Sequence, residues 1–537
     1  MSSDDVRNTQ SRREFLATGG AVAGAVAVGI GAAPAAQAAS PKRGGVLRFA
    51  TRSDARGLDP HANIIYYVSQ PLAGTSGGLL DIDYQVNPIP GIASEWSISK
   101  DLKTYKFKLQ KGIEYHNGAD VDAASVKWNY ERILDPKIGY AFTRASLLNI
   151  ERMEAPDKHT FIAHLKEPSS VFLSNVTYYP CNLIAPNSVD EVNEHPVGCG
   201  PFKFKSWKRF DSTVLERFEN FWETGVDGKP LPYLDGMVGM PRKEDRVRFT
   251  ALRAGEAHLI ENMGYADAGT FKQKYGDRFN IHPVAQVGTG FVQFNLKKGP
   301  FAYSTPGSQH LRTAVAHAVD REAIHQAVFY GLSDAAKGFY SKASPWYMPE
   351  LEGPPPYDPD KARFHMKKAG YNGEKILLYS RDNYQYMQQT GELVHALLTD
   401  AGFNVSHEIV PWPVLRAKYK DASYHIDSSA NSYRPDPDGW FFRQMHSNGP
   451  ANKFRRGYKN ERVDKLSTMA RVEPDKEKRR LLYLEAENII NRELPVLYTH
   501  FIPLTGASVK TLKDYRPAFP GPFNYHGGGV RTAWFDI

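Results

Sequence analysis

Near the middle of the chain, the stretch Gly288-Thr289-Gly290-Phe291-Val292-Gln293-Phe294-Asn295 joins two glycines to a run of β-branched and aromatic residues. The run predicts a strand, and glycine accepts backbone rotations that other residues resist, so the chain can change direction ahead of it. Two interpretations follow. The strand is either the place where the chain crosses from one domain into another, or an ordinary strand after an ordinary turn.

On the C-terminal side of this stretch, helices alternate with short apolar strands. Asp358 and Pro359 are a typical helix cap and first helical residue, and Gly370 is a typical helix end. Residues 393–398 give an apolar helical face before the strand-like segment 403–405. This alternation predicts α/β lobes with largely buried sheets.

The N-terminal side, from Gly44 to about Pro201, reads as strands mixed with a few helices. Apolar and polar residues alternate in 104–109, which is the period of a half-buried strand. A helix follows, started by Asp120 or Asp122 and stopped by the Asp135-Pro136 pair. No internal repeat or low-complexity linker separates these regions, so strand crossovers are expected to connect the domains.

The composition is that of an ordinary globular protein, with 537 residues, 41% hydrophobic and 23% charged. This excludes disorder, collagen and coiled coil. The formal net charge of +8 is small for a chain of this length, and no block of like charges occurs. No nucleic-acid partner is therefore expected. Cys181 and Cys199 are the two cysteines; they either pair or stay as buried free thiols.

Residues 1–38 have the pattern of an export signal. Ser11-Arg12-Arg13-Glu14-Phe15-Leu16 precedes an uncharged stretch rich in Ala, Gly and Val, and Ala36-Gln37-Ala38 fits a processing site. The twin arginines resemble the twin-arginine (Tat) signal, which implies the Tat translocase as an export partner and the periplasm as the destination. A membrane anchor is the alternative, but Ala and Gly contribute little transfer free energy.

Enzyme motifs are mostly absent from the rest of the chain. Gly74-Thr75-Ser76-Gly77-Gly78 matches G-x-S-x-G but lacks the flanking strand and helix of a nucleophile elbow. His310, His317 and His325 lie seven or eight residues apart, without a helper ligand three or four residues away, which favours surface or core histidines over a metal site. The basic-aromatic segment 453–459 is interpreted as a solvated loop. No catalytic residue, cofactor or metal is therefore predicted.

Aromatic residues in polar loops are the stronger functional signal. Trp346, Trp412 and Trp440 are examples, and such rings suit a small-molecule site. In Arg434-Pro435-Asp436-Pro437-Asp438-Gly439-Trp440, two prolines stiffen a turn that presents carboxylates beside an indole. The turn is either a receptor for a cation or amine, or a structural turn capped by its aspartates.

The order of several short motifs resembles the extracellular solute-binding proteins, family 5, of ABC importers, over essentially the whole mature chain. The family usually has threonine where Cys199 stands. The motifs are Arg43–Leu47, Leu58–Pro60, Pro90–Ala93, Trp96, Tyr105–Leu109, Gly112, His116–Gly118, Glu131–Pro136, Gly198–Phe202, Phe294-Asn295, Arg312, Ala314, Ala318–Arg321, Tyr357–Ala362, Ala369–Tyr371, Asp436–Asp438 and Gly457–Asn460.

The resemblance implies a two-lobed periplasmic binding protein fold of type II, the large peptide-binding subtype, with an extra subdomain inserted in the first lobe. Hinge closure would bury a ligand between the lobes. The implied partners are a small-molecule or peptide ligand and an ABC permease, and a monomer is expected. The implied boundaries are a signal peptide at 1–38, first-lobe segments at 39–75, 198–287 and 505–537, an inserted subdomain at 76–197 and a second lobe at 288–504.

One position departs from the family pattern. Peptide binders commonly place an aspartate three residues before the acidic-Pro pair, where it binds the ligand's α-amino group; here Tyr433 stands there. A phenol forms no such ion pair, so an opine, a blocked peptide or another polar solute competes with ordinary peptides. The candidate ligand-binding residues are Tyr433, Asp436, Asp438, Trp440, Trp412, Arg381 and Trp346.

Two rival functions remain open. Nickel or metal-chelate capture within the same family would use a histidine such as His446. A secreted hydrolase would need a pair of nucleophile and base that the sequence does not offer.

Overall fold

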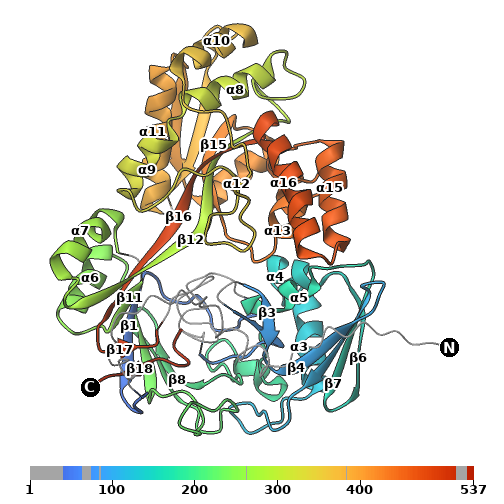
Figure 1. Cartoon of the computed structure of the whole chain (residues 1–537), viewed down its shortest axis with the longest axis vertical. Coiled ribbons are helices and arrows are strands. Elements are labelled where there is room, and N and C mark those ends of the chain that lie inside the picture. Colours follow the sequence, from blue (N-terminus) through green and yellow to red (C-terminus); the bar gives the residue numbers. More distant parts are fainter. Residues whose placement is uncertain (1–39, 63–73, 84–85, 262, 383, 516–528) are drawn as a thin grey trace, which may run out of the picture. The chain divides into compact units, whose positions relative to one another are not determined.

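The computed structural model describes residues 40–62, 74–83, 86–261, 263–382, 384–515 and 529–537 (Figure 1). The predicted export signal lies outside the described residues. The described residues divide into two compact units: those within 40–263, 277–282 and 506–537 form one, and those within 264–276 and 283–505 form the other. In the described part, no helix is both long and apolar enough to cross a membrane.

Two long strands carry the chain between the units. β12 (Phe279–Phe294) passes from the first unit into the second after His282, and β16 (Val496–Val509) returns after Thr505. Residues 264–276, which include α7 (Tyr265–Tyr275), group with the second unit although the sequence analysis assigns them to the first lobe.

The glycines at 288 and 290 lie inside β12, opposite Ser432 and Ala430 of β15 (Ile426–Ser432), so the alternative that they form an ordinary turn ahead of the strand is wrong. Close packing explains them instead. A Cβ at Gly290 would lie 2.2 Å from the ring of His500, and one at Gly288 would lie 2.6 Å from the backbone oxygen of Asn431.

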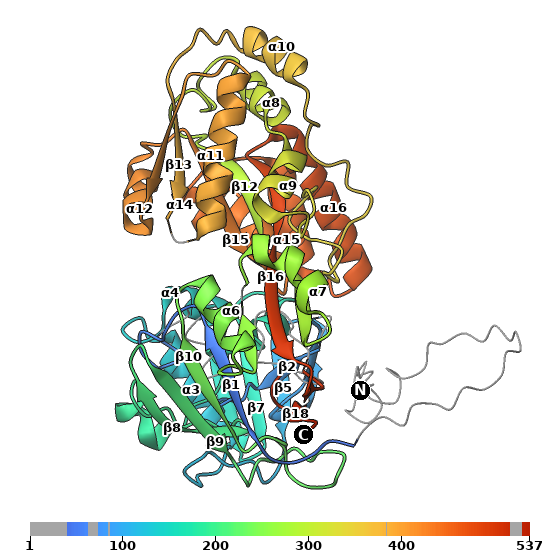
Figure 2. The same ribbon diagram turned by 90° about the vertical axis from the view of Figure 1, so that its left-hand side faces the viewer.

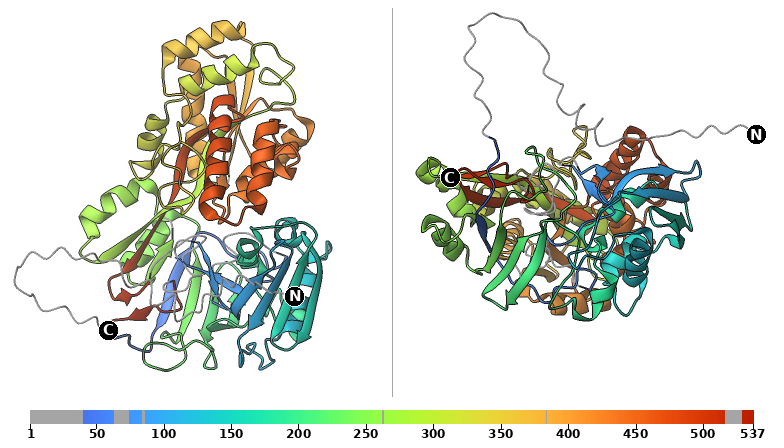
Figure 3. Two further views of the ribbon diagram at one scale, coloured as in Figure 1. Left: turned by 45° about the vertical axis from the view of Figure 1, so that its right-hand side comes forward. Right: turned by 90° about the horizontal axis from the view of Figure 1, so that it is seen from below.

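The first unit contains a mixed sheet in the order β16-β11-β1-β10-β9-β8 (Figure 3). β1 runs parallel to β10 and β11, and β9 is antiparallel to its neighbours. Leu47, Phe49, Leu215 and Met237 belong to its core. The elements are β1 (Val46–Thr51), β8 (Phe202–Lys208), β9 (Ser212–Arg217), β10 (Gly236–Pro241), α6 (Asp245–Arg253), β11 (Leu259–Glu261), β17 (Leu512–Lys513) and β18 (Trp534–Phe535).

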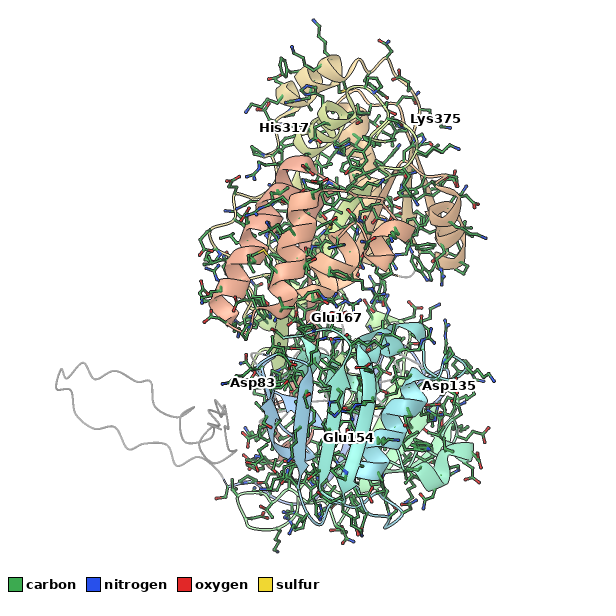
Figure 4. The ribbon with its side chains drawn as sticks, turned by 90° about the vertical axis from the view of Figure 1, so that its right-hand side faces the viewer. Asp83, Asp135, Glu154, Glu167, His317 and Lys375 are labelled. Carbon is green, nitrogen blue, oxygen red and sulfur yellow. The ribbon has the colours of Figure 1, made fainter. Side chains whose placement is uncertain are left out.

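A second, antiparallel sheet in the order β4-β5-β7-β6 has its own hydrophobic core within the same unit. Figure 4 shows Glu154 on this sheet and Asp135 at the end of α3. β5 alternates as predicted, and Asp122 caps α3 through a capping box with Ser125. The elements are β2 (Leu80–Ile82), β3 (Pro88–Pro90), β4 (Ala93–Ile98), β5 (Thr104–Leu109), α3 (Ala123–Leu134), α4 (Ala141–Leu147), β6 (Ile150–Asp157), β7 (Thr160–Leu165), α5 (Phe172–Val176) and two short 3₁₀ helices at Tyr179–Cys181 and Pro186–Glu191.

Cys181 and Cys199 are free thiols in this core. Burial raises the pKa of each thiol to about 12, so both remain protonated at neutral pH. Of the two alternatives that the sequence left open, the structure shows the unpaired thiols.

The second unit has a sheet in the order β14-β13-β15-β12-β16 with helices on both faces (Figure 2), which confirms the predicted α/β class. α11 covers the face that carries Ser380 and His407, whereas α12 packs with Tyr379 on the other face. The elements are α8 (Ser308–Ala318), α9 (Arg321–Phe329), α10 (Pro359–Ala369), β13 (Ile376–Arg381), α11 (Gln385–Asp400), β14 (Val405–Val410), α12 (Trp412–Asp421), β15 (Ile426–Ser432), α13 (Asp438–Trp440), a π-helical turn (Phe441–Met445), α14 (Pro450–Phe454), α15 (Glu461–Val472) and α16 (Lys476–Glu493).

Replacing Gly290 by alanine should lower the free energy of unfolding by about 1–3 kcal/mol, because the new methyl overlaps the buried His500 ring. Gly269→Ala is the control: it lies in α7, where the added methyl would have no atom within 4 Å, and should raise stability by about 0.5–1 kcal/mol. Denaturant titration measures both. Equal stability of the Gly290→Ala variant and the parent would contradict the close approach of β12 and His500.

Candidate ligand-binding site

The turn that follows β15 is held in place by buried polar contacts. The Tyr433 hydroxyl lies 2.8 Å from the Ser344 hydroxyl, and burial raises the pKa of Tyr433 above its usual value. The phenol is 4% exposed and therefore stays neutral.

Both carboxylates of the turn have arginine partners. Arg479 on α16 donates two hydrogen bonds to Asp436, at 2.8 and 2.5 Å, and both side chains are under 10% exposed. Arg471 lies 2.9 Å from Asp438, whose pKa burial raises to about 6. Neither carboxylate is therefore without a charge partner in this structure.

The two indoles at this turn, Trp440 and Trp346, also have hydrogen-bond partners within the protein. Trp440 is fully buried, and its ring stacks on that of Phe339 with ring centres 4.1 Å apart. Its Nε1 donates a hydrogen bond to the Tyr498 hydroxyl at 2.7 Å. Trp346 donates from Nε1 to the carbonyl oxygen of Pro435 at 3.0 Å. Five of the seven candidate residues thus have partners within the protein, and four of these five are buried. Their contact with a ligand stays a prediction.

The other two candidates, Arg381 and Trp412, lie in a separate cluster that also contains Arg455. The Arg381 guanidinium is 5.1 Å from the centre of the Trp412 ring and that of Arg455 is 5.7 Å from it. We call these three residues the arginine–tryptophan cluster.

Strand direction explains why the arginine–tryptophan cluster forms. β13 runs parallel to both β14 and β15, so the carboxyl ends of the three strands lie at one edge of the sheet. Arg381 is the last residue of β13, and Trp412 begins the helix that follows β14. In open α/β sheets this edge is where ligands bind.

The arginines of the cluster have hydrogen-bond partners but no ion-pair partner among the described carboxylates. Arg381 donates from Nη2 to the Ser429 hydroxyl and the Ala430 carbonyl, both at 3.1 Å, and Arg455 donates to the Asn431 side-chain oxygen at 3.4 Å. Nε of Arg381 and Nδ2 of Asn431 are buried and have no acceptor among the described residues. These donors suit an anionic oxygen.

Asp427 is the carboxylate beneath this cluster. It is fully buried, accepts hydrogen bonds from the Tyr419 hydroxyl at 2.5 Å and from Gln293 at 2.8 Å, and burial raises its pKa. The Asp427 carboxylate interacts electrostatically with the Arg381 and Arg455 guanidiniums, but no hydrogen bond or ion pair joins it to either of them among the described residues.

Arg455 is not among the residues predicted from the sequence, because segment 453–459 is interpreted there as a solvated loop. That interpretation is wrong: Arg456 is fully buried against the rings of Phe291 and Trp440, and Arg455 faces Trp412. The available signal was the Arg-Arg pair between Phe454 and Tyr458, which can bury guanidiniums against rings.

The rival functions receive little support from the described residues. Nδ1 of His446 accepts from the Asn448 N–H at 2.9 Å, and among the described residues no group of three or more possible ligands could hold a metal ion. The Ser76 hydroxyl accepts a hydrogen bond from the Asn182 amide at 3.2 Å rather than from a histidine.

Residues 87–453 match the model of the bacterial extracellular solute-binding proteins, family 5, and the chain belongs to this family. Among curated relatives, the glutathione-binding protein GsiB of Escherichia coli O6:K15:H31 (strain 536 / UPEC) is 27% identical over 515 residues, which cover 92% of this chain and 95% of the relative. GsiB of Pectobacterium atrosepticum is 26% identical over 459 residues, covering 82% and 85%.

Solved structures show the same fold. DppA from Helicobacter pylori, in complex with the peptide STSA, has a TM-score of 0.78 at 21% identity, and AgaA from A. tumefaciens R10, in complex with agropinic acid, has 0.76 at 24%. Each covers 92% of this chain and 99% of the solved chain. The likeness confirms the two-lobed periplasmic binding protein fold.

Asp436→Asn should lower the free energy of unfolding by about 3–5 kcal/mol, because it leaves the buried Arg479 guanidinium without its counter-charge. Glu485→Gln is the matched control: Arg462 also holds Glu485 in a two-bond ion pair, but both side chains are about half exposed, so a loss of at most about 1 kcal/mol is expected. Urea titration measures both variants. A stable Asp436→Asn protein that has lost ligand affinity would show instead that Asp436 serves the ligand.

Proposed function

We propose that this protein is a periplasmic, non-catalytic binding protein that captures a peptide-like solute bearing a carboxylate and delivers it to an ABC permease. The observation that carries the proposal is the arginine–tryptophan cluster, whose two guanidiniums have no ion-pair partner among the described residues. Arginine keeps its charge at any physiological pH and matches the planar geometry of a carboxylate.

The charge distribution supports an anionic rather than a cationic ligand group. The carboxylates of Asp436 and Asp438 are paired with arginines of the protein, and the Tyr433 hydroxyl is bonded to Ser344. Of these described groups at the turn, none is left to form a strong ion pair with a ligand's ammonium. An N-blocked peptide or an opine therefore fits as well as an ordinary peptide.

The relatives agree with this class of solute. GsiB is a glutathione-binding protein, and DppA and AgaA hold the peptide STSA and agropinic acid; all three compounds carry carboxylate groups. We expect the same kind of group to dock at Arg381 and Arg455. The protein acts as a monomer that presents its ligand to the membrane-embedded permease.

Arg381→Gln and Arg455→Gln should each weaken binding of the solute that co-purifies with the protein, identified by mass spectrometry. Losing a charge-assisted hydrogen bond in a dry site costs about 1.5–3 kcal/mol, or roughly 10- to 150-fold in affinity. Calorimetric titration after removal and re-addition of the solute measures the change.

Arg416→Gln is the control for these variants, because Arg416 is exposed on the same helix as Trp412 and stacks on Phe454 instead. Its affinity should equal that of the parent. If both cluster variants fold, as judged by their melting curves, and bind as tightly as the parent, Arg381 and Arg455 do not hold the solute.

The export route is the second part of the proposal. Replacing Arg12 and Arg13 together by lysine should leave the protein in the cytoplasm, because lysine lacks the planar guanidinium of the twin-arginine signal. Cell fractionation with immunoblotting measures the distribution. Arg7→Lys, outside the motif, should export normally, and normal periplasmic amounts of the double variant would remove the Tat assignment.

A further inference from the structure

Three histidines of the second unit gather on two neighbouring helices, away from the arginine–tryptophan cluster. His310 and His317 lie on α8, and His365 reaches them from α10. Figure 4 labels His317. Spacing along the sequence predicts no neighbouring ligand for the histidines of α8, whereas in the structure His365 of α10 contacts both of them.

The distances within this histidine cluster are short. Nδ1 of His310 lies 3.0 Å from Nδ1 of His365. The ring of His365 also stacks on that of His317, with centres 5.7 Å apart and planes 19° apart. His317 is 6% exposed and donates from Nδ1 to the Pro356 carbonyl at 2.8 Å, which fixes its ring.

The two helices are held together at both ends of α8. At its C-terminal end, the Asp358 N–H donates to the His317 carbonyl oxygen at 2.9 Å. At its N-terminal end stands Gly307, with φ +74°, where a Cβ would lie 2.5 Å from the carbonyl oxygen of Ala369. Only glycine permits this approach, so the backbones that carry His310 and His365 are preorganised.

We propose that His310 and His365 bind a divalent copper ion through their Nδ1 atoms, with water completing the coordination. Imidazole nitrogens bind such ions at about 2.0–2.1 Å. Two nitrogens 3.0 Å apart then subtend about 90° at the metal, whereas a tetrahedral ion would need a separation of roughly 3.3 Å. A right angle between nitrogen ligands is typical of square-planar or tetragonal Cu²⁺ and Ni²⁺, and copper binds more tightly.

Without metal, one Nδ1–H donates to the other Nδ1. Binding requires the donating ring to carry its proton on Nε2, which is a change of tautomer without net release of a proton. Among the described residues no third histidine, cysteine or carboxylate completes the site, so it is a two-ligand, exchangeable site.

Equilibrium dialysis of the purified mature protein against Cu²⁺ alone, with electron paramagnetic resonance of the loaded protein, tests the proposal. His310→Ala and His365→Ala should each bind one Cu²⁺ fewer per chain than the parent and lose the spectral component of two nitrogen ligands. His310 is exposed, so its replacement should not disturb folding, which a melting curve without metal verifies.

His395→Ala is the matched control. His395 also stacks on another histidine, His407, with centres 5.9 Å apart, but Nε2 of His395 is bonded to the Val405 carbonyl and Nε2 of His407 to the Ser380 hydroxyl. This variant should keep every Cu²⁺ of the parent. An unchanged copper count and spectrum in the His310→Ala protein would overturn the proposal, as would an equal loss in all three variants.

Discussion

The parallel alignment of β13, β14 and β15 is the constraint on which the candidate site depends. Because parallel strands end at the same edge of a sheet, their last residues and the segments that follow them meet there. Arg381 and Trp412 come together for this reason, although the chain between them forms a helix and a strand. Arg455 reaches the same place from the end of α14.

Charge pairing separates two groups of residues that the sequence alone does not distinguish. The charges of Asp436 and Arg479 neutralise one another in the core, and removing either side chain would leave the other as an unpaired buried charge. Arg381 and Arg455 instead stack on an indole and donate to neutral oxygens, so their positive charge is not cancelled by a direct partner among the described residues. The first arrangement fixes a turn, and the second favours an anion.

The histidine cluster on α8 and α10 rests on a different feature, the close approach of two helices. It shares no residue with the arginine–tryptophan cluster, so each can be altered without touching the other. The copper proposal and the proposed function therefore stand on separate observations within one unit.

Local signals in the sequence determined much of the secondary structure. The alternation in 104–109 gave β5, Asp122 capped α3, and Asp358, Pro359 and Gly370 bounded α10 as expected. These features depend on residues within a few positions of one another, where periodicity and capping chemistry act directly. The ordered motifs likewise sufficed for the family and the two-lobed fold.

Only the tertiary structure decided which charged and aromatic side chains are paired with other residues of the protein and which can still bind a ligand. The partner of Asp436 lies 43 positions away, that of His310 lies 55 positions away, and Gly290 of β12 is required by its close approach to His500. The sequence of segment 453–459 predicts a solvated loop because the rings that bury its arginines, such as Phe291 and Trp412, are distant in sequence. Such pairings follow from sheet register and helix packing, which the order of residues specifies only through the whole fold.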